Sequence, residues 1–109
     1  MKFRPIIVVA GEPNSIFSEI FIKTINQRKF RSPIILICSK KLFLKQAKHL
    51  KLNFNFKEIK KITDLVKNYK YKKLNLINVN YMQSKPFEKI SSKSNKYIKD
   101  CFDIGLKLM

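Results

Sequence analysis

Residues 5–38 read PIIVVAGEPNSIFSEIFIKTINQRKFRSPIILIC, and this stretch decides the fold class. Two short apolar runs, at 5–10 and 33–38, are rich in Ile and Val and do not alternate with polar residues. Such runs are typical of strands buried on both faces, as in a parallel sheet that is covered by helices. Between them, residues 15–27 repeat apolar side chains with helical period. The stretch therefore predicts a right-handed strand–helix–strand unit.

The two sides of the first predicted helix differ in polarity. One broad face is apolar and is predicted to be buried: Ile16, Phe17, Ile20, Phe21 and Ile25. The other face is polar and is predicted to be exposed: Ser18, Glu19, Lys23 and Asn26. We expect Asn14 or Ser15 to cap the N-terminus of this helix, because a short polar side chain there accepts a free backbone N–H.

The same pattern continues along the chain. Ser39 is predicted to cap a second helix at 40–50, which buries Leu42, Phe43, Ala47 and Leu50. Further strands are expected at 54–59 and 74–79, with a short helix in the polar connection at 60–73. A last helix at 94–108 has an apolar face that includes Gly105, where glycine either lets another backbone approach closely or is simply tolerated. Its flank of Ile98, Phe102 and Leu106 favours association.

Residues 1–109 are therefore predicted to form one α/β unit, with a βαβ-type, mostly parallel sheet and helices on its faces. No apolar run approaches the length of a membrane span. Cys38 and Cys101 lack metal-site or redox-motif spacing and are predicted to be buried free thiols in a cytoplasmic protein. His49 is the only histidine, so we expect no metal site and no catalytic residue in this chain.

The net charge of +17 raises the question of nucleic-acid binding. Only three of the 24 basic residues are arginine, the residue that best grips phosphates, and the lysines are spread along the whole chain. The abundance of Lys, Asn, Ile, Phe and Tyr also fits a base-composition bias in the genome, because these residues have A/T-rich codons. We therefore do not expect a nucleic-acid partner. The alternative is a small basic α/β module that binds RNA or another polyanion, with Tyr69, Tyr71, Phe54 and Phe56 stacking on bases.

The turn after the first strand is the candidate binding site. Gly11 permits backbone angles that other residues avoid, and Pro13 stiffens the turn. Backbone N–H groups at residues 14–17 would face anions at the carboxyl edge of the sheet, where open α/β sheets bind ligands. The cofactor-binding candidates are Gly11, Glu12, Asn14 and Ser15; alternatively, the Glu12 carboxylate itself accepts these N–H groups.

IIVVAGEPNSIFSEIFIK resembles the N-terminal segment of the 4-hydroxythreonine-4-phosphate dehydrogenase family, which opens with a strand, a G-[DE]-P-A-G-I-G-P-E motif and a helix. Matching positions are Gly11, Glu12, Pro13, Ile16 and Glu19. Asn14, Ser15, Phe17 and Ser18 depart from the motif and remove both of its internal glycines. IILICSKKLFLKQAKHLKLNF is similar to the second strand and helix of the family. SSKSNKYIKDCFDIGLKLM is similar to the start of a long family helix, with Asn95 kept and Lys96 in place of a glycine.

This resemblance implies part of an isocitrate/isopropylmalate dehydrogenase-like fold. It also implies an NAD-dependent enzyme of pyridoxine biosynthesis, which oxidises and decarboxylates the phosphorylated amino acid 4-phosphooxy-L-threonine. The full-length family enzyme is expected to be a cytoplasmic homodimer that uses a histidine-held divalent metal (Zn, Mg or Co). Because one histidine cannot form that metal site, we interpret the chain as an N-terminal portion that is inactive alone and binds neither cofactor tightly.

Overall fold

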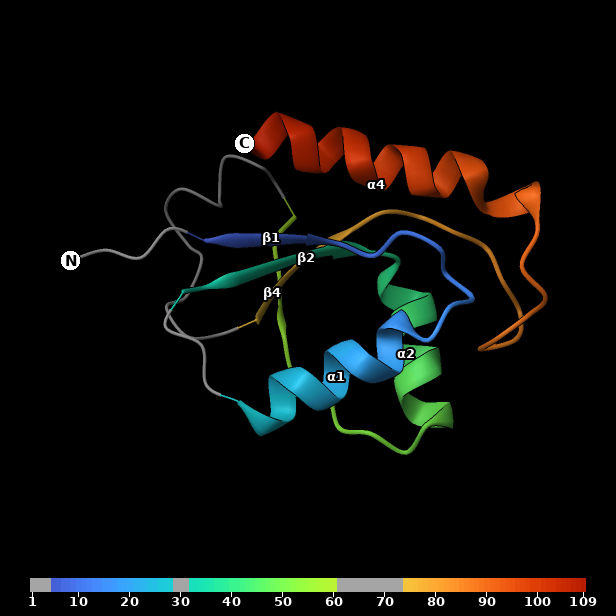
Figure 1. Cartoon of the computed structure of the whole chain (residues 1–109), viewed down its shortest axis with the longest axis horizontal. Coiled ribbons are helices and arrows are strands. Elements are labelled where there is room, and N and C mark those ends of the chain that lie inside the picture. Colours follow the sequence, from blue (N-terminus) through green and yellow to red (C-terminus); the bar gives the residue numbers. More distant parts are fainter. Residues whose placement is uncertain (1–4, 29–31, 61–73) are drawn as a thin grey trace.

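Parallel strands form the centre of the structure, a computed structural model that describes residues 5–28, 32–60 and 74–109 (Figure 1). Among the described residues, the strands are β1 (Ile6–Val9), β2 (Ile34–Cys38), β3 (Lys57–Glu58) and β4 (Leu74–Asn78). They lie in the spatial order β1-β2-β4-β3. The register sets Ile7 opposite Ile35 and Leu36 opposite Leu76. The predicted parallel sheet, with the first two strands as neighbours, is confirmed.

Helices cover the two faces of this sheet unequally. α1 (Phe17–Gln27) and α2 (Lys40–His49) lie on one face, and α4 (Asn95–Leu108) lies on the other, after the short 3-10 helix η1 (Ser92–Ser94) (Figure 1). Because successive strand residues point to opposite faces, β2 serves both layers. Leu36 joins the core under α1 and α2, whereas Ile35 and Ile37 join the core under α4.

Strand β3 is shorter than predicted. The expected strand covered residues 54–59, but only Lys57 and Glu58 pair with β4. Phe54 and Phe56 instead turn their rings into the core: the Phe54 ring centre lies 4.8 Å from that of Phe43 in α2. The helix predicted within 60–73 falls almost entirely outside the described residues.

The buried side of α1 is rotated from the prediction. The helix begins at Phe17 instead of Ser15, and its buried residues are Ser18 and Ile22. Ile16 and Ile20, predicted to be buried, are 72% and 54% exposed. The predicted Phe17, Phe21 and Ile25 are half-buried and pack against the core, so the prediction is confirmed in part. The buried side is centred on Ile22, with Ser18 one helical turn before it.

Helices α2 and α4 follow the predicted pattern more closely. The Ser39 side chain caps α2 by accepting the N–H of Leu42, and the predicted Leu42, Phe43 and Ala47 are buried. Leu50 is only half-buried and comes after the last residue of α2, while the polar Gln46 is buried instead.

On α4, Gly105 faces β1. A Cβ added at Gly105 would lie 3.0 Å from Val9 Cγ2, so α4 packs tightly on β1 at this position. The neighbours of Gly105 are side chains of the sheet and not another backbone. The flank of α4 that was expected to stay exposed does so at Phe102 and Leu106, while Ile98 is half-buried. Among the described residues, no helix combines the length and the apolar character that crossing a membrane requires.

Candidate functional site

The turn that follows β1 is held by its own side chains. Gly11 has φ of +69°, and a Cβ added there would meet nothing within 4 Å, so backbone conformation alone requires glycine. Glu12 Oε1 accepts the backbone N–H of Asn14 at 3.1 Å. Glu12 Oε2 and the Ser91 carbonyl oxygen, at 3.3 and 3.2 Å, share the single hydroxyl proton of Ser94. The Glu12 carboxylate therefore ties the turn to the start of α4.

Asn14 connects the same turn to the segment between β4 and η1. Its side-chain amide exchanges two hydrogen bonds with that of Gln83, at 3.1 and 2.8 Å. Asn14 Oδ1 also accepts the backbone N–H of Glu88 at 2.9 Å. These bonds occupy the carbonyl oxygen and one donor of Asn14 within the protein.

Ser15 stabilises the start of α1. Its hydroxyl donates to the Glu12 carbonyl at 2.9 Å and accepts the Phe17 N–H at 3.2 Å. The formal cap residue is Ile16, which offers no side-chain bond, so Ser15 supplies this contact from one position earlier. The N–H groups of Asn14 and Phe17, which the sequence suggested for anion binding, are thus bonded to Glu12 and Ser15.

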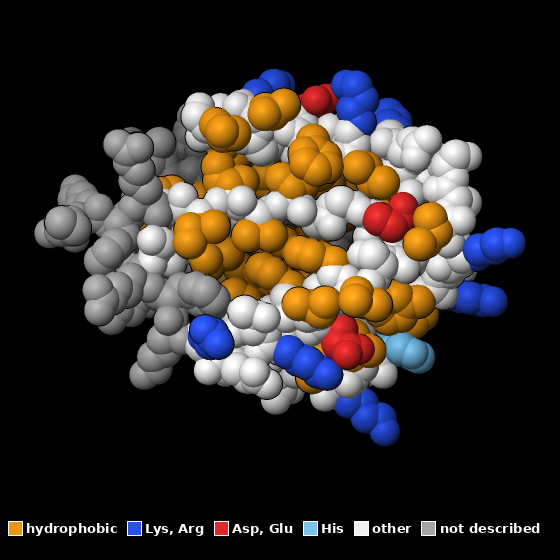
Figure 2. Space-filling view, viewed as in Figure 1, with side chains coloured by type: hydrophobic (Ala, Val, Ile, Leu, Met, Phe, Trp, Pro, Cys, Tyr) orange, Lys and Arg blue, Asp and Glu red, His pale blue; other side chains and the backbone are white. Residues whose placement is uncertain are grey.

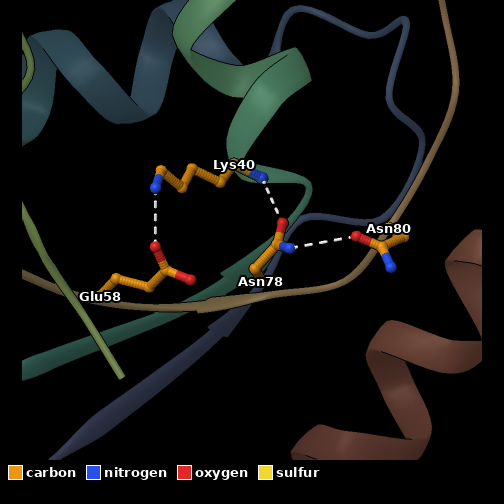
Figure 3. A network of polar contacts seen from close by, with 4 residues as sticks. All are labelled: Lys40, Glu58, Asn78 and Asn80. Carbon is orange, nitrogen blue, oxygen red and sulfur yellow. Dashed lines mark hydrogen bonds and ion pairs between the residues drawn. The ribbon is translucent and has the colours of Figure 1, made fainter. Parts of the chain in front are cut away.

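A second polar cluster lies at the carboxyl ends of the neighbouring strands β2 and β4 (Figure 3). Lys40, in the first turn of α2, places its Nζ 2.7 Å from Glu58 Oε1 on β3. Its backbone N–H donates to Asn78 Oδ1 at the end of β4, and Asn78 Nδ2 donates to Asn80 Oδ1. The chain leaves β2 toward one face and reaches α4 on the other face after β4. This arrangement is the topological switch point at which open sheets bind ligands.

Sequence reasoning missed this cluster. Lys40, Glu58 and Asn78 come from three elements, and only the strand order β1-β2-β4-β3 brings them together. The one local signal was a lysine directly after the Ser39 cap. The Lys40 and Glu58 side chains are 39% and 23% exposed, so solvent reaches the ion pair.

Between the two clusters lies a small cavity. Its volume is about 10 Å³, and its polar lining consists of Glu12, Ser18, Ser39, Gln46 and Tyr97. Ser18 Oγ is the buried side-chain atom without a hydrogen-bond partner among the described residues. A space of this size holds about one water molecule, so a phosphate group does not fit inside it.

The buried hydroxyl and thiol groups beneath this edge are poor nucleophiles near neutral pH. Tyr97 accepts the Ser39 N–H at 2.8 Å through its hydroxyl, and burial raises its pKa. Cys38 and Cys101 are buried free thiols, as predicted. Burial raises the pKa of Cys101 to about 11, and burial, followed by the charge of Cys101, raises the pKa of Cys38. Both thiols are therefore protonated near neutral pH and are poor nucleophiles.

Among the described residues, His49 does not belong to a cluster of possible metal ligands. His49 is exposed, and its ring centre lies 5.9 Å from that of Phe87. No group of three or more His, Cys, Asp or Glu able to hold a metal ion occurs within residues 5–28, 32–60 and 74–109.

Neither models of known protein families nor curated protein sequences match this chain.

Proposed function

We propose that the chain forms the N-terminal α/β portion of an NAD-dependent dehydrogenase that oxidises and decarboxylates 4-phosphooxy-L-threonine. The observation that supports this proposal is the hydrogen bond between Glu12 and Ser94. It joins residues 11–19 and 91–109, the two segments that resemble the family's opening motif and its long helix. The two segments meet at the carboxyl edge of a parallel sheet, where α/β enzymes bind ligands.

In this proposal the chain supplies a wall of the active-site cleft. Lys40 is the cation at the switch point, and it follows the Ser39 cap at the N-terminus of α2, where the helix dipole favours negative charge. A phosphorylated ligand in the crevice would attract Lys40 Nζ away from Glu58. The turn at Gly11–Ser15 then holds α4 in place through Glu12, which is a positioning role.

The described residues do not fit the divalent metal that the family implies. That metal requires several neutral imidazoles, whereas the chain has one histidine, which lies exposed on α2. A phosphate contact of NAD at residues 14–17 also lacks support, because two N–H groups there are already bonded. We therefore assign no reaction step to this chain and propose that the metal ligands come from other sequence of a cytoplasmic homodimer.

Fragment complementation tests this proposal. A family dehydrogenase that lacks its own N-terminal segment is mixed with this chain, with NAD, substrate and divalent metal, and NADH formation is followed at 340 nm. We expect activity only in the mixture, and a lower yield of active complex with Gly11→Val, which strains the turn. Turnover by the chain alone would contradict the proposal, as would a mixture that stays inactive although the two pieces bind each other.

A second function rests on a different observation. Lys85, Phe87, Glu88 and Lys89 line an open hollow of about 620 Å³, which combines two lysines and an aromatic ring with one carboxylate. This arrangement suits a single-stranded polyanion. RNA binding tighter than about 1 µM at about 150 mM salt would favour this alternative, and its loss in Lys85→Ala/Lys89→Ala would locate the site; binding only at low salt would reflect the net charge of +17.

A further inference from the structure

Ser18 is a polar residue on the buried side of α1. It is 3% exposed, and its Oγ is the buried side-chain atom without a hydrogen-bond partner among the described residues. Its surroundings on α1 are apolar, because Ile22 is fully buried one turn later and Phe17 and Phe21 pack against the same core. Figure 2 also shows hydrophobic side chains gathered between α1 and α4. A hydroxyl group buried in such surroundings costs free energy unless it forms a hydrogen bond.

The small cavity beside Ser18 is lined by polar residues from several parts of the chain. Glu12 comes from the turn after β1, Ser39 from the cap of α2, Gln46 from α2 itself and Tyr97 from α4. The turn and the helices α1, α2 and α4 therefore each bring a polar side chain to the same space. Its volume of about 10 Å³ lies at the lower limit for one water molecule.

The lining of this cavity offers both donors and acceptors. The two N–H groups of Gln46 Nε2 already bond to the carbonyl oxygens of Pro13 and Pro86, so Gln46 Oε1 is the atom that can accept from a ligand. Each carboxylate oxygen of Glu12 accepts one hydrogen bond and keeps a further lone pair. The Ser18 hydroxyl can donate and accept. A ligand of this size that also donates and accepts is a water molecule.

We propose that this cavity binds one internal water molecule, which bonds to Ser18 Oγ and links α1 to the carboxyl edge of the sheet. The water also donates to an acceptor across the cavity, on Glu12 or Gln46. This bond gives a physical reason for the rotation of α1, which buries Ser18 and leaves Ile16 and Ile20 exposed. The proposal does not depend on the dehydrogenase function, because the cavity is too small for a phosphate group.

A high-resolution crystal structure of the chain tests the site directly. We expect one density peak about 2.8 Å from Ser18 Oγ and within about 3.2 Å of a second polar group that lines the cavity. A bond from Ser18 Oγ to the Asn14 carbonyl oxygen, four residues earlier, would overturn the proposal, as would a cavity without density. A peak with several oxygen ligands within about 2.5 Å would also overturn it, because such distances indicate a metal ion.

Relaxation dispersion of water oxygen-17 tests the site in solution, because it detects water molecules that stay inside a protein and does not depend on exchanging hydroxyl protons. Ser18→Val removes the hydroxyl and fills the cavity. Thr24→Val is the matched control, because it removes a hydroxyl from the exposed side of the same helix, where Thr24 bonds to the Ile20 carbonyl. We expect Ser18→Val to lose the signal of one internal water molecule and Thr24→Val to keep it.

Equal oxygen-17 signals in the two folded variants would contradict a water molecule held by Ser18. Circular dichroism checks that both variants fold. Ser18→Cys takes the place of Ser18→Val if valine prevents folding, because its thiol is larger than the hydroxyl and forms only weak hydrogen bonds.

The stability of Ser18→Ala separates a hydroxyl bonded to water from a hydroxyl without any partner. Removing an unpartnered buried hydroxyl should raise the folding equilibrium constant by about tenfold or more, because its desolvation cost disappears. We expect a smaller rise or a fall, even with the higher helix propensity of alanine, because the variant also loses the bond to water. Urea denaturation of wild type and Ser18→Ala measures the change, and a rise of about tenfold or more would count against the water site.

Discussion

The carboxyl edge of the sheet and the edge formed by β1 satisfy their polar groups in opposite ways. At the carboxyl edge, Glu12, Asn14 and Gln46 bond to backbone and side chains from distant parts of the chain. Along β1, the outward N–H and C=O groups of Ile7 and Val9 meet no strand among the described residues. The difference shows that polar side chains can bond the groups of one edge within the protein, whereas the apolar side chains of β1 offer its outward backbone groups no such partners.

The largest effect should come from Gln46, the polar residue buried at the closed edge. Its Nε2 donates to the carbonyl oxygens of Pro13 and Pro86 at 2.7 and 2.9 Å. Gln46→Ala leaves both carbonyls without this donor and should lower the free energy of unfolding by about 2–3 kcal/mol. Urea denaturation measures the loss. Lys45→Ala is the matched control, because its exposed bonds to Gln83 and Ser84 should be worth little.

A comparable loss is expected at alkaline pH beneath the same edge. Burial raises the pKa of Cys101 from 9.0 to about 11, so the thiol's contribution is fully present below pH 9 and is lost as pH rises through 11. The folded protein should lose about 2 kcal/mol from this group by pH 11. Denaturation of wild type and Cys101→Ala at pH 8 and pH 11 isolates it. Equal pH dependence in the two proteins would show that this thiol does not control the alkaline loss.

A smaller effect is expected at the turn. Gly11→Ala places a side chain at φ of +69° without any steric neighbour, so only backbone strain should appear. We expect a loss of about 1 kcal/mol in thermal or urea denaturation. Gly11→Asn should lose less, because asparagine tolerates this conformation better. If alanine and asparagine were equally harmless, the turn would not depend on the left-handed conformation.

The smallest effect on stability should come from the ion pair at the switch point. Glu58→Gln removes the partner of Lys40 from a solvent-accessible contact, so stability should fall by less than about 1 kcal/mol. The freed lysine should bind inorganic phosphate more tightly, which titration calorimetry can measure. Glu19→Gln is the matched control, because it also removes one carboxylate and frees a lysine, Lys23, from an exposed ion pair. Unchanged phosphate affinity in Glu58→Gln would contradict the proposal that Lys40 contacts a phosphorylated ligand at the switch point.

The sequence predicted the elements with continuous or capped patterns well. The apolar run of β2 and the Ser39 cap of α2 are local signals, and both predictions are confirmed. On α1, Phe17, Phe21 and Ile25 pack against the core as predicted. The predictions for Ile16, Ile20 and Ser18 are wrong, because the exact register of the helix depends on contacts with α2 and the turn. At the candidate site, the sequence indicated the Gly11 turn but not the cluster of Lys40, Glu58 and Asn78. That cluster depends on strand order, which local patterns do not encode.

Amide hydrogen exchange by NMR tests the contrast between the two edges most directly. In dilute protein, we predict slow exchange for Ile6, Ala10, Asn14 and Phe17, whose N–H groups are bonded, and fast exchange for Ile7 and Val9. Slow exchange of Ile7 and Val9 in the dilute protein, or fast exchange of Asn14 and Phe17, would contradict an open β1 edge beside a closed carboxyl edge.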